Sequence, residues 1–440
     1  MGYLHIAFFA LGGAVLFVYV QSFIRAYRSQ LTQIPGPWYG PFTSLHLNYG
    51  FSSGDIWKDV EEYHAQYGSI VRLGPRQVWI ADKDALKTIL VKDDLPKVAT
   101  YKEFSRDRYS PGIFGEMKLK RFLAPAFTVN YIDNLEYIFA HTVRSLLFNY
   151  AQKNAVGNPV AGIETDLMSD LHNVALDIMG ESTFGRGFGQ ISASMSATTE
   201  TDIDEKVWAK IPKSIFNGLK KRHQTVFIKR FFRHFGWEMQ FDWPEQMAKA
   251  IEVMMQRRMR VTGDKLEAAE TRHDLLQHVI EQGKRPDNGK PMTGREIADH
   301  MSEVLIGGSE TTSNQMACLF LELARNPGVR AKLLDSLPAV SIHDDDNIIT
   351  SKMVRSEPRY SYLEACITEN LRLNPIASEL GRRTGAEWTT LGDYKLPPYT
   401  VVCASYRALH RNEEHWPQPL RFWPERWLPE DQRGDAPPAK

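Results

Sequence analysis

The run Gly307-Gly308-Ser309-Glu310-Thr311 is the first feature of this sequence that could do chemistry. A carboxylate beside a hydroxyl can pass protons, and a threonine hydroxyl can also bond to a carbonyl one helical turn earlier and bend the helix. Each glycine costs a helix about 1 kcal/mol relative to alanine, so the pair indicates that space is needed here. The alternative is that the glycines let a second helix pack closely.

A long helix is predicted to carry this segment. Thr293-x-x-Glu296 is a capping-box sequence, in which the threonine hydroxyl bonds an orphan backbone N–H and the glutamate reaches back to the cap. Apolar residues then recur at helical spacing until Asn326-Pro327, where proline disfavours a continuation. We therefore expect one helix from Thr293 to Arg325.

A second group of candidate residues lies on a shorter predicted helix. Ser361-x-x-Glu364 is another capping-box candidate, and it precedes Glu369 and Arg372, which share a helix face because they are three residues apart. On an exposed helix such a pair is commonplace and worth only a few tenths of a kcal/mol. Arg426 could complete a buried Glu-Arg-Arg network, because guanidinium donors suit bidentate pairing with one carboxylate.

Composition and periodicity indicate the fold class. The 440 residues are 43% hydrophobic and 24% charged, which allows a sizeable core and excludes disordered, collagenous and polytopic membrane classes. Basic and acidic residues are equal at 53 each, so no global field favours a nucleic acid, and we expect no nucleic-acid partner. Helical patterns at 167–184 and 244–259, against strand patterns at 67–80 (a hairpin) and 388–404, predict a mainly α fold with a minor β-sheet.

The N-terminus has the pattern of a membrane anchor. The first 24 residues contain no charged side chain, and Tyr3 to Val20 is apolar apart from one histidine, a helix of about 27 Å that nearly spans a bilayer core. Two arginines follow, so the positive-inside tendency places the rest of the chain in the cytosol. We predict a single-pass signal-anchor and hinge over residues 1–33 and one catalytic domain over 34–440. A cleaved signal peptide, the alternative, would have a basic start and an A-x-A-like site.

Residues 206–237 form a local basic segment. They include nine Lys or Arg and no Asp or Glu, interleaved with aromatic side chains. On a tethered protein this composition suggests a surface that rests on anionic lipid headgroups, so membrane lipid is a predicted partner. A solvated basic face with its aromatic residues in the core is equally open.

Taken together, these motifs resemble a microsomal cytochrome P450, a haem-thiolate monooxygenase of fungal style. The resemblance implies a cytochrome P450-like fold, a haem cofactor with its iron, and insertion of one oxygen atom from dioxygen into a small lipophilic substrate in secondary metabolism. It also implies electrons from NADPH-cytochrome P450 reductase and location in the endoplasmic reticulum membrane. The motifs that carry it, in chain order, are IPGPW (34–38), RFLAPAF (121–127), ALDIMGESTFG (175–185), GGSETT (307–312), ARNPGVRAKLL (324–334), ENLR (369–372) and PERW (424–427).

The resemblance also assigns roles to the catalytic candidates. Glu310 and Thr311 would deliver protons to the dioxygen that the haem binds, in a groove opened by Gly307 and Gly308. A structural triad behind the haem would consist of Glu369, Arg372 and Arg426.

Two further positions correspond to the family's haem-propionate ligands. Lys120 stands where the family often has an arginine, and Glu116 where it often has Trp or His, so the sequence departs from the pattern there. Arg382, with Arg383 as a rival, stands where the family's other propionate arginine usually lies.

The largest departure concerns the axial ligand. The family's FxxGxRxCxG loop, whose cysteine thiolate binds the iron, is not found in these 440 residues, and Cys318, Cys366 and Cys403 are each typical of small buried hydrophobic residues. Their spacing also fits no zinc site or disulfide framework, so no metal ligand is predicted and the bulk of the chain is expected in a reducing compartment. The sequence thus predicts a family member truncated at its C-terminal end. The alternative to an enzyme is an inactive membrane-anchored fragment or interaction protein without haem-thiolate chemistry.

Overall fold

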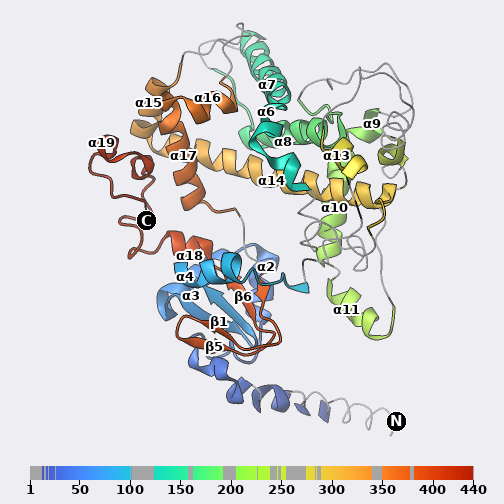
Figure 1. Cartoon of the computed structure of the whole chain (residues 1–440), viewed down its shortest axis with the longest axis vertical. Helices are drawn as coiled ribbons and strands as arrows, with labels where there is room; N and C mark the ends of the chain where they lie inside the picture. Colours follow the sequence, from blue (N-terminus) through green and yellow to red (C-terminus); the bar gives the residue numbers. More distant parts are fainter. Residues whose placement is uncertain are drawn as a thin grey trace. The chain divides into compact units, whose positions relative to one another are not determined.

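Figure 1 shows the computed structural model of the chain, which packs as two compact units. The first unit comprises residues 1–98, 371–421 and 437–440, and the second comprises 99–370 and 422–436. The structure describes residues 12–13, 16–17, 19–24, 26–99, 101, 123–156, 162–191, 205–224, 226–237, 245, 249–253, 274–282, 284, 289–338, 349–376 and 381–439.

The first unit contains a four-stranded sheet in the order β1-β2-β6-β3. Strands β1 (Ile70–Gly74) and β2 (Gln77–Ile80) pair antiparallel, which confirms the hairpin predicted over 67–80. Strand β6 (Val401–Ala404) runs parallel to β2, and β3 (Arg382–Arg383) pairs antiparallel with β6. A distant segment of the sequence therefore completes the sheet that the hairpin starts.

Both faces of this sheet are buried, because successive side chains of a strand point to opposite faces. On β2, Val78 and Ile80 belong to one buried apolar cluster, and Trp79 between them belongs to another. The remaining elements of this unit are η1 (Gln30–Gln33), α2 (Leu45–Ser53), α3 (Ile56–Tyr67), α4 (Lys83–Lys87), η2 (Thr88–Lys92), α18 (Tyr406–His410) and the hairpin of β4 (Thr389–Leu391) with β5 (Tyr394–Leu396).

The proline-rich segment that follows residue 33 packs against the sheet. The Arg72 backbone N–H donates to the Pro35 carbonyl at 2.8 Å, and a Cβ at Gly36 would collide with the Arg72 carbonyl. Leu31 and Ile34 are both buried in the sheet's apolar core. The chain at the boundary between the predicted hinge and the predicted catalytic domain is therefore held by one backbone hydrogen bond and two buried side chains.

The second unit is built around α14 (Gly294–Arg325), which lies beside α8 (Leu167–Phe184) (Figure 1). Both helices were predicted from periodicity, and both are confirmed. The capping box of α14 is also confirmed, since the Glu296 N–H donates to Thr293 Oγ1 at 3.4 Å and the Thr293 N–H donates to Glu296 Oε2 at 2.7 Å.

Apolar side chains from α8, α10 (Ile211–Gln224), α13 (Leu275–Gln282) and α14 form one buried cluster in this unit. The other elements of the unit are η4 (Ala124–Phe127), α6 (Val129–Asp133), α7 (Glu136–Val156), α9 (Glu205–Trp208), α11 (Val226–His234), α15 (Pro327–Ser336), α16 (Ser351–Ser356), η5 (Pro358–Tyr360), α17 (Ser361–Leu373), η6 (Pro424–Trp427) and α19 (Glu430–Arg433). The prediction of a mainly helical chain with a small sheet is confirmed. Most of the helix predicted over 244–259 lies outside the described residues.

The basic segment over 206–237 has aromatic residues both in the core and on the surface. Trp208 is buried, its ring stacks on Phe188 with centroids 5.3 Å apart, and its Nε1–H donates to the Gly187 carbonyl. Phe235 and Trp237 are exposed. The start of the segment is therefore part of the core, and an exposed aromatic end remains available to a lipid surface.

Most of the predicted transmembrane helix, Tyr3 to Val20, lies outside the described residues. Within the described part of the chain, no helix has both the length and the apolar character to cross a membrane.

Candidate functional site

The proton-transfer candidates lie in the middle of α14. The Thr311 hydroxyl donates to the Gly307 carbonyl at 2.7 Å, which confirms the predicted bond to the preceding turn. The Thr311 side chain is exposed and Glu310 is half-buried. Because the hydroxyl donates its proton to the backbone, its oxygen keeps lone pairs that can accept a hydrogen bond from outside the helix.

The glycine next to them makes a helix contact. A Cβ at Gly308 would lie 2.5 Å from both Cε and Sδ of Met179 on α8, so the absence of a side chain lets the two helices approach. The space at Gly308 is therefore taken by the end of the Met179 side chain, as the helix-packing alternative predicts. The roles of Gly307 and Gly308 toward a cofactor stay predictions.

Glu369 on α17 accepts two hydrogen bonds and forms an ion pair. Its carboxylate is fully buried, with Oε1 accepting from the Trp423 backbone N–H at 2.9 Å and Oε2 accepting from Trp427 Nε1–H at 3.0 Å. The Arg426 Nε lies 3.4 Å from Oε1, and neither side chain of this pair is exposed to solvent. One carboxylate thus holds three groups of the segment that includes η6. Sequence reasoning predicted the arginine but missed both tryptophans, whose signal is their position on either side of Pro424-Glu425-Arg426.

Arg372, the third predicted member of the triad, makes its described contacts in the first unit. Its Nη1 donates to the His410 carbonyl at 2.6 Å and the Pro419 carbonyl at 2.8 Å, and Nη2 donates to the Arg421 carbonyl at 3.3 Å. The guanidinium carbon also lies 5.0 Å from the centre of the Trp416 ring. The structure thus shows the Glu369–Arg426 pair, and it shows Arg372 donating to buried carbonyls of an irregular segment. The triad as a whole stays a prediction.

The predicted capping box at the start of α17 is wrong. An N-cap residue needs extended backbone, yet Ser361 has helical angles of φ −57° and ψ −33°. Glu357 precedes the turn with extended angles, and Pro358 occupies the first position of η5, where its fixed φ favours a helical start. The chain is therefore already helical at Ser361, and this serine is not the N-cap residue that a capping box with Glu364 requires.

The propionate candidates are only partly within the described residues. Arg382 lies on β3, where its Nη1 donates to the Leu95 carbonyl at 3.0 Å and lies 3.8 Å from Asp94 Oδ1. Its rival Arg383 places its guanidinium 4.8 Å from the Tyr399 ring centre. Lys120 and Glu116 lie outside the described residues. The propionate roles stay predictions.

The surroundings of the three cysteines are those of structural residues, since apolar burial disfavours the thiolate form. Burial, together with the nearby carboxylate of Glu425, raises the pKa of Cys366 to about 12, and burial also raises the pKa of Cys318. Cys403 is fully buried on β6, and its Sγ accepts a hydrogen bond from Gln77 Nε2 at 3.3 Å. In the part of the chain that is described, no cluster of three or more His, Cys, Asp or Glu side chains could hold a metal ion.

Comparison with known proteins supports the resemblance seen in the sequence. A model of the cytochrome P450 family matches residues 34–439. The cytochrome P450 monooxygenase acrD of Aspergillus aculeatus is 27% identical over 428 residues, which cover 96% of this chain and 80% of acrD. The cytochrome P450 monooxygenase FUS8 of Gibberella fujikuroi is 27% identical over 93% of this chain and 76% of its own length. The cytochrome P450 monooxygenase olcB of Penicillium canescens is 25% identical over 99% of this chain and 84% of its own length.

Proposed function

Because the chain belongs to the cytochrome P450 family, we propose that it is a haem-dependent monooxygenase that inserts one oxygen atom from dioxygen into a small lipophilic substrate in secondary metabolism. The observation that carries this proposal is the family match along residues 34–439. The relatives from Aspergillus, Gibberella and Penicillium are all named cytochrome P450 monooxygenases, and the predicted enzyme class, an oxidoreductase of the monooxygenase type, is thereby confirmed at the level of the family.

The cellular setting is part of the same proposal. Electrons come from NADPH-cytochrome P450 reductase, and the chain is anchored in the endoplasmic reticulum membrane with its bulk in the cytosol. The apolar composition of Tyr3 to Val20 supports the anchor. Alkaline carbonate extraction of microsomes tests it: an anchored chain stays in the pellet, and release into the supernatant contradicts the anchor.

Within this function, Glu310 and Thr311 are proposed to move protons in the middle of α14. The Thr311 hydroxyl is supported by its bond to the Gly307 carbonyl, which fixes where the oxygen lone pairs point. Thr311→Ala should raise the peroxide formed per NADPH consumed, and Thr311→Ser should restore the coupling. Thr312→Ala is the matched control, since Thr312 is the next exposed threonine on the same helix. Equal peroxide yields from Thr311→Ala and Thr312→Ala would contradict the proposed proton-transfer role of Thr311.

A second function is favoured by the cysteines. If none of the three thiols binds iron, these 440 residues form a membrane-anchored protein that keeps the family scaffold without haem-thiolate chemistry. The observation behind this candidate is the full burial of Cys366 and Cys403 within the fold.

One measurement on the purified 440-residue chain separates the two functions. Haem is quantified after growth with a haem precursor, and the absorbance is recorded after reduction in the presence of carbon monoxide. Haem at one equivalent with a thiolate-type band supports the monooxygenase. Haem-free protein with a cooperative unfolding transition supports the second function and contradicts the first for this chain.

A further inference from the structure

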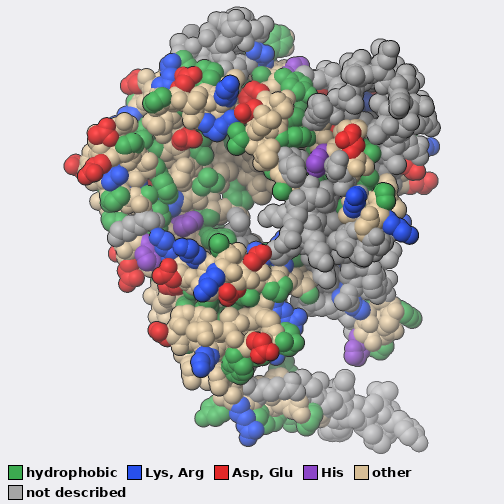
Figure 2. Space-filling view, viewed as in Figure 1, with side chains coloured by type: hydrophobic (Ala, Val, Ile, Leu, Met, Phe, Trp, Pro, Cys, Tyr) green, Lys and Arg blue, Asp and Glu red, His purple; other side chains and the backbone are tan. Residues whose placement is uncertain are grey.

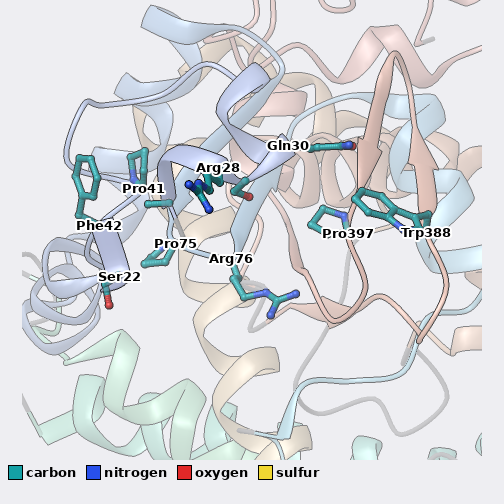
Figure 3. Close-up of a pocket in the computed structure, with 11 residues that line it drawn as sticks. Ser22, Arg28, Gln30, Pro41, Phe42, Pro75, Arg76, Trp388 and Pro397 are labelled. Carbon is teal, nitrogen blue, oxygen red and sulfur yellow. The ribbon is translucent and has the colours of Figure 1, made fainter. Parts of the chain in front are cut away.

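A cavity of about 570 Å³ lies within the first unit. Its walls come from the helical residues before η1, the segment before α2, the β1–β2 turn and the neighbourhood of β4 and β5. Figure 3 shows Arg28 and Arg76 between Pro41 and Phe42 on one side and Trp388 on the other. The volume is within the range of ordinary small-ligand sites, roughly 300–1,000 Å³.

Among the described residues, the lining is positively charged and contains no acidic side chain. Arg28 and Arg76 are both exposed, and hydroxyl and amide groups of Ser22, Ser29 and Gln30 complete its polar part. Among the described residues neither arginine makes an ion pair, and the only hydrogen bond from Arg76 goes from Nη2 to the Pro398 carbonyl. Most of the guanidinium donors in the cavity are therefore available to an anion.

A third arginine adds positive charge beneath the cavity. Arg72 is 1% exposed, and its Nη2 donates to the carbonyl of Pro75, which itself lines the cavity. Its Nη1 is buried and has no hydrogen-bond partner among the described residues. Burial alone lowers the pKa of Arg72 to about 10, without an opposing carboxylate. A buried cation without a counter-charge is costly, so an anion bound nearby would be stabilised by it.

An exposed apolar surface lies beside the basic cavity. The helical residues before Arg28 expose apolar side chains at Leu16, Phe17, Val20, Phe23, Ile24 and Tyr27. Phe23 stacks on Phe42 of the cavity wall with ring centroids 4.9 Å apart and planes within 4°. In Figure 2 this N-terminal segment, at the bottom of the view, shows hydrophobic side chains next to a basic one. A ligand held by both features has an anionic head and an apolar tail.

We propose that this cavity binds the phosphate headgroup of an anionic phospholipid, with Arg28 and Arg76 as its ligands and the exposed apolar side chains before Arg28 against the acyl chains. Arginine suits a phosphate ligand, because a guanidinium group donates two parallel hydrogen bonds to its oxygens. Trp388, which is 53% exposed at the edge of the cavity, suits the interface between headgroup and water. This site is independent of the proposed oxidation reaction.

The test measures binding of fluorescently labelled phosphatidic acid to the full chain in neutral detergent. Each basic residue near an anionic lipid surface contributes about fivefold in affinity, so Arg28→Gln with Arg76→Gln should weaken binding roughly 25-fold. The matched control is Arg325→Gln with Arg330→Gln, which removes the same charge from exposed arginines of the second unit and should leave binding unchanged. Arg28→Gln alone should weaken binding about fivefold, and it changes an exposed side chain without described partners, so it should fold like the wild type.

Each remaining outcome decides the proposal. Equal losses in both double variants would mean that only net charge matters, and the cavity would not be the site. Binding of phosphatidylcholine as tightly as phosphatidic acid would remove the role of the anionic head. Competition by free glycerol phosphate at concentrations comparable to the lipid would identify a soluble phosphate ester as the ligand and overturn the lipid assignment.

Discussion

Replacing the carboxylate of Glu369 by an amide should destabilise the second unit strongly. In the wild type, Glu369 balances the charge of Arg426 with both side chains shielded from solvent. Glu369→Gln keeps the shape but removes the negative charge that faces Arg426 in this pair, and breaking a buried pair in this way costs about 3–5 kcal/mol. That is a large fraction of the roughly 5–15 kcal/mol by which a folded domain is stable.

The hydrogen bonds add to this cost. The two oxygens of Glu369 accept from different N–H groups, those of Trp423 and Trp427. A glutamine has one oxygen and one NH₂ group, so in either orientation one of the two N–H donors faces another donor. A buried donor without an acceptor costs about 1–3 kcal/mol. Because such costs are not additive for neighbouring groups, we expect a total loss of about 4 kcal/mol.

Urea unfolding followed by far-ultraviolet circular dichroism measures the loss. Glu364→Gln is the matched control, since Glu364 is an exposed carboxylate on the same helix and should change the free energy of unfolding by less than about 0.5 kcal/mol. Glu369→Gln with Arg426→Met removes both charges and should recover about 2 kcal/mol relative to Glu369→Gln alone. If Glu369→Gln is as stable as the control, or if the double variant recovers nothing, the uncompensated-charge argument is refuted.

Three further predictions use the same protein. Burial outweighs the nearby Glu296 carboxylate and lowers the pKa of His300 to about 4, from about 6.5 when unfolded, so stability should be complete above pH 6.5 and fall by on the order of 3 kcal/mol as the pH drops toward 4. His300→Gln should flatten that profile, and an unchanged profile would contradict it. Gly308→Ala should change the free energy of unfolding by less than about 1 kcal/mol because the end of Met179 can move, whereas Gly308→Val should lose about 2–3 kcal/mol; equal effects would contradict the contact. Under native conditions iodoacetamide should modify half-buried Cys318 first, and peptide mapping that finds another cysteine modified earlier would contradict the burial argument.

Local sequence signals predicted the helices around the candidate site well. Two similar motifs show when such a signal fails. Thr293-x-x-Glu296 and Ser361-x-x-Glu364 have the same capping-box pattern, yet only the first forms a cap. The difference is Pro358, which starts a helical turn before Ser361 and leaves the serine with helical angles. A capping motif therefore predicts a helix start only when no stronger start signal precedes it.

The long-range contacts of Arg372 could not be predicted from the sequence, for a physical reason. The partners of Arg372 are carbonyls 38 to 49 residues away, and any carbonyl can accept from a guanidinium, so no residue type marks them. The same holds for the cavity with Arg28 and Arg76, whose walls come from segments hundreds of residues apart. Gly308 was ambiguous because a glycine has no side chain to show whether its space is filled.

The arrangement at Glu369 explains why this carboxylate is fully buried. The segment from Phe422 to Leu428 is buried at several positions but contains only the four-residue helix η6, so few of its polar groups are satisfied by regular secondary structure. A fully buried acceptor with two oxygens can satisfy several donors at once, provided that a cation balances its charge. Trp423 and Trp427 supply the donors, and Arg426 between them supplies the cation. The Glu-Arg pattern is therefore specific only in combination with this aromatic segment, which is why neither motif alone identified the site.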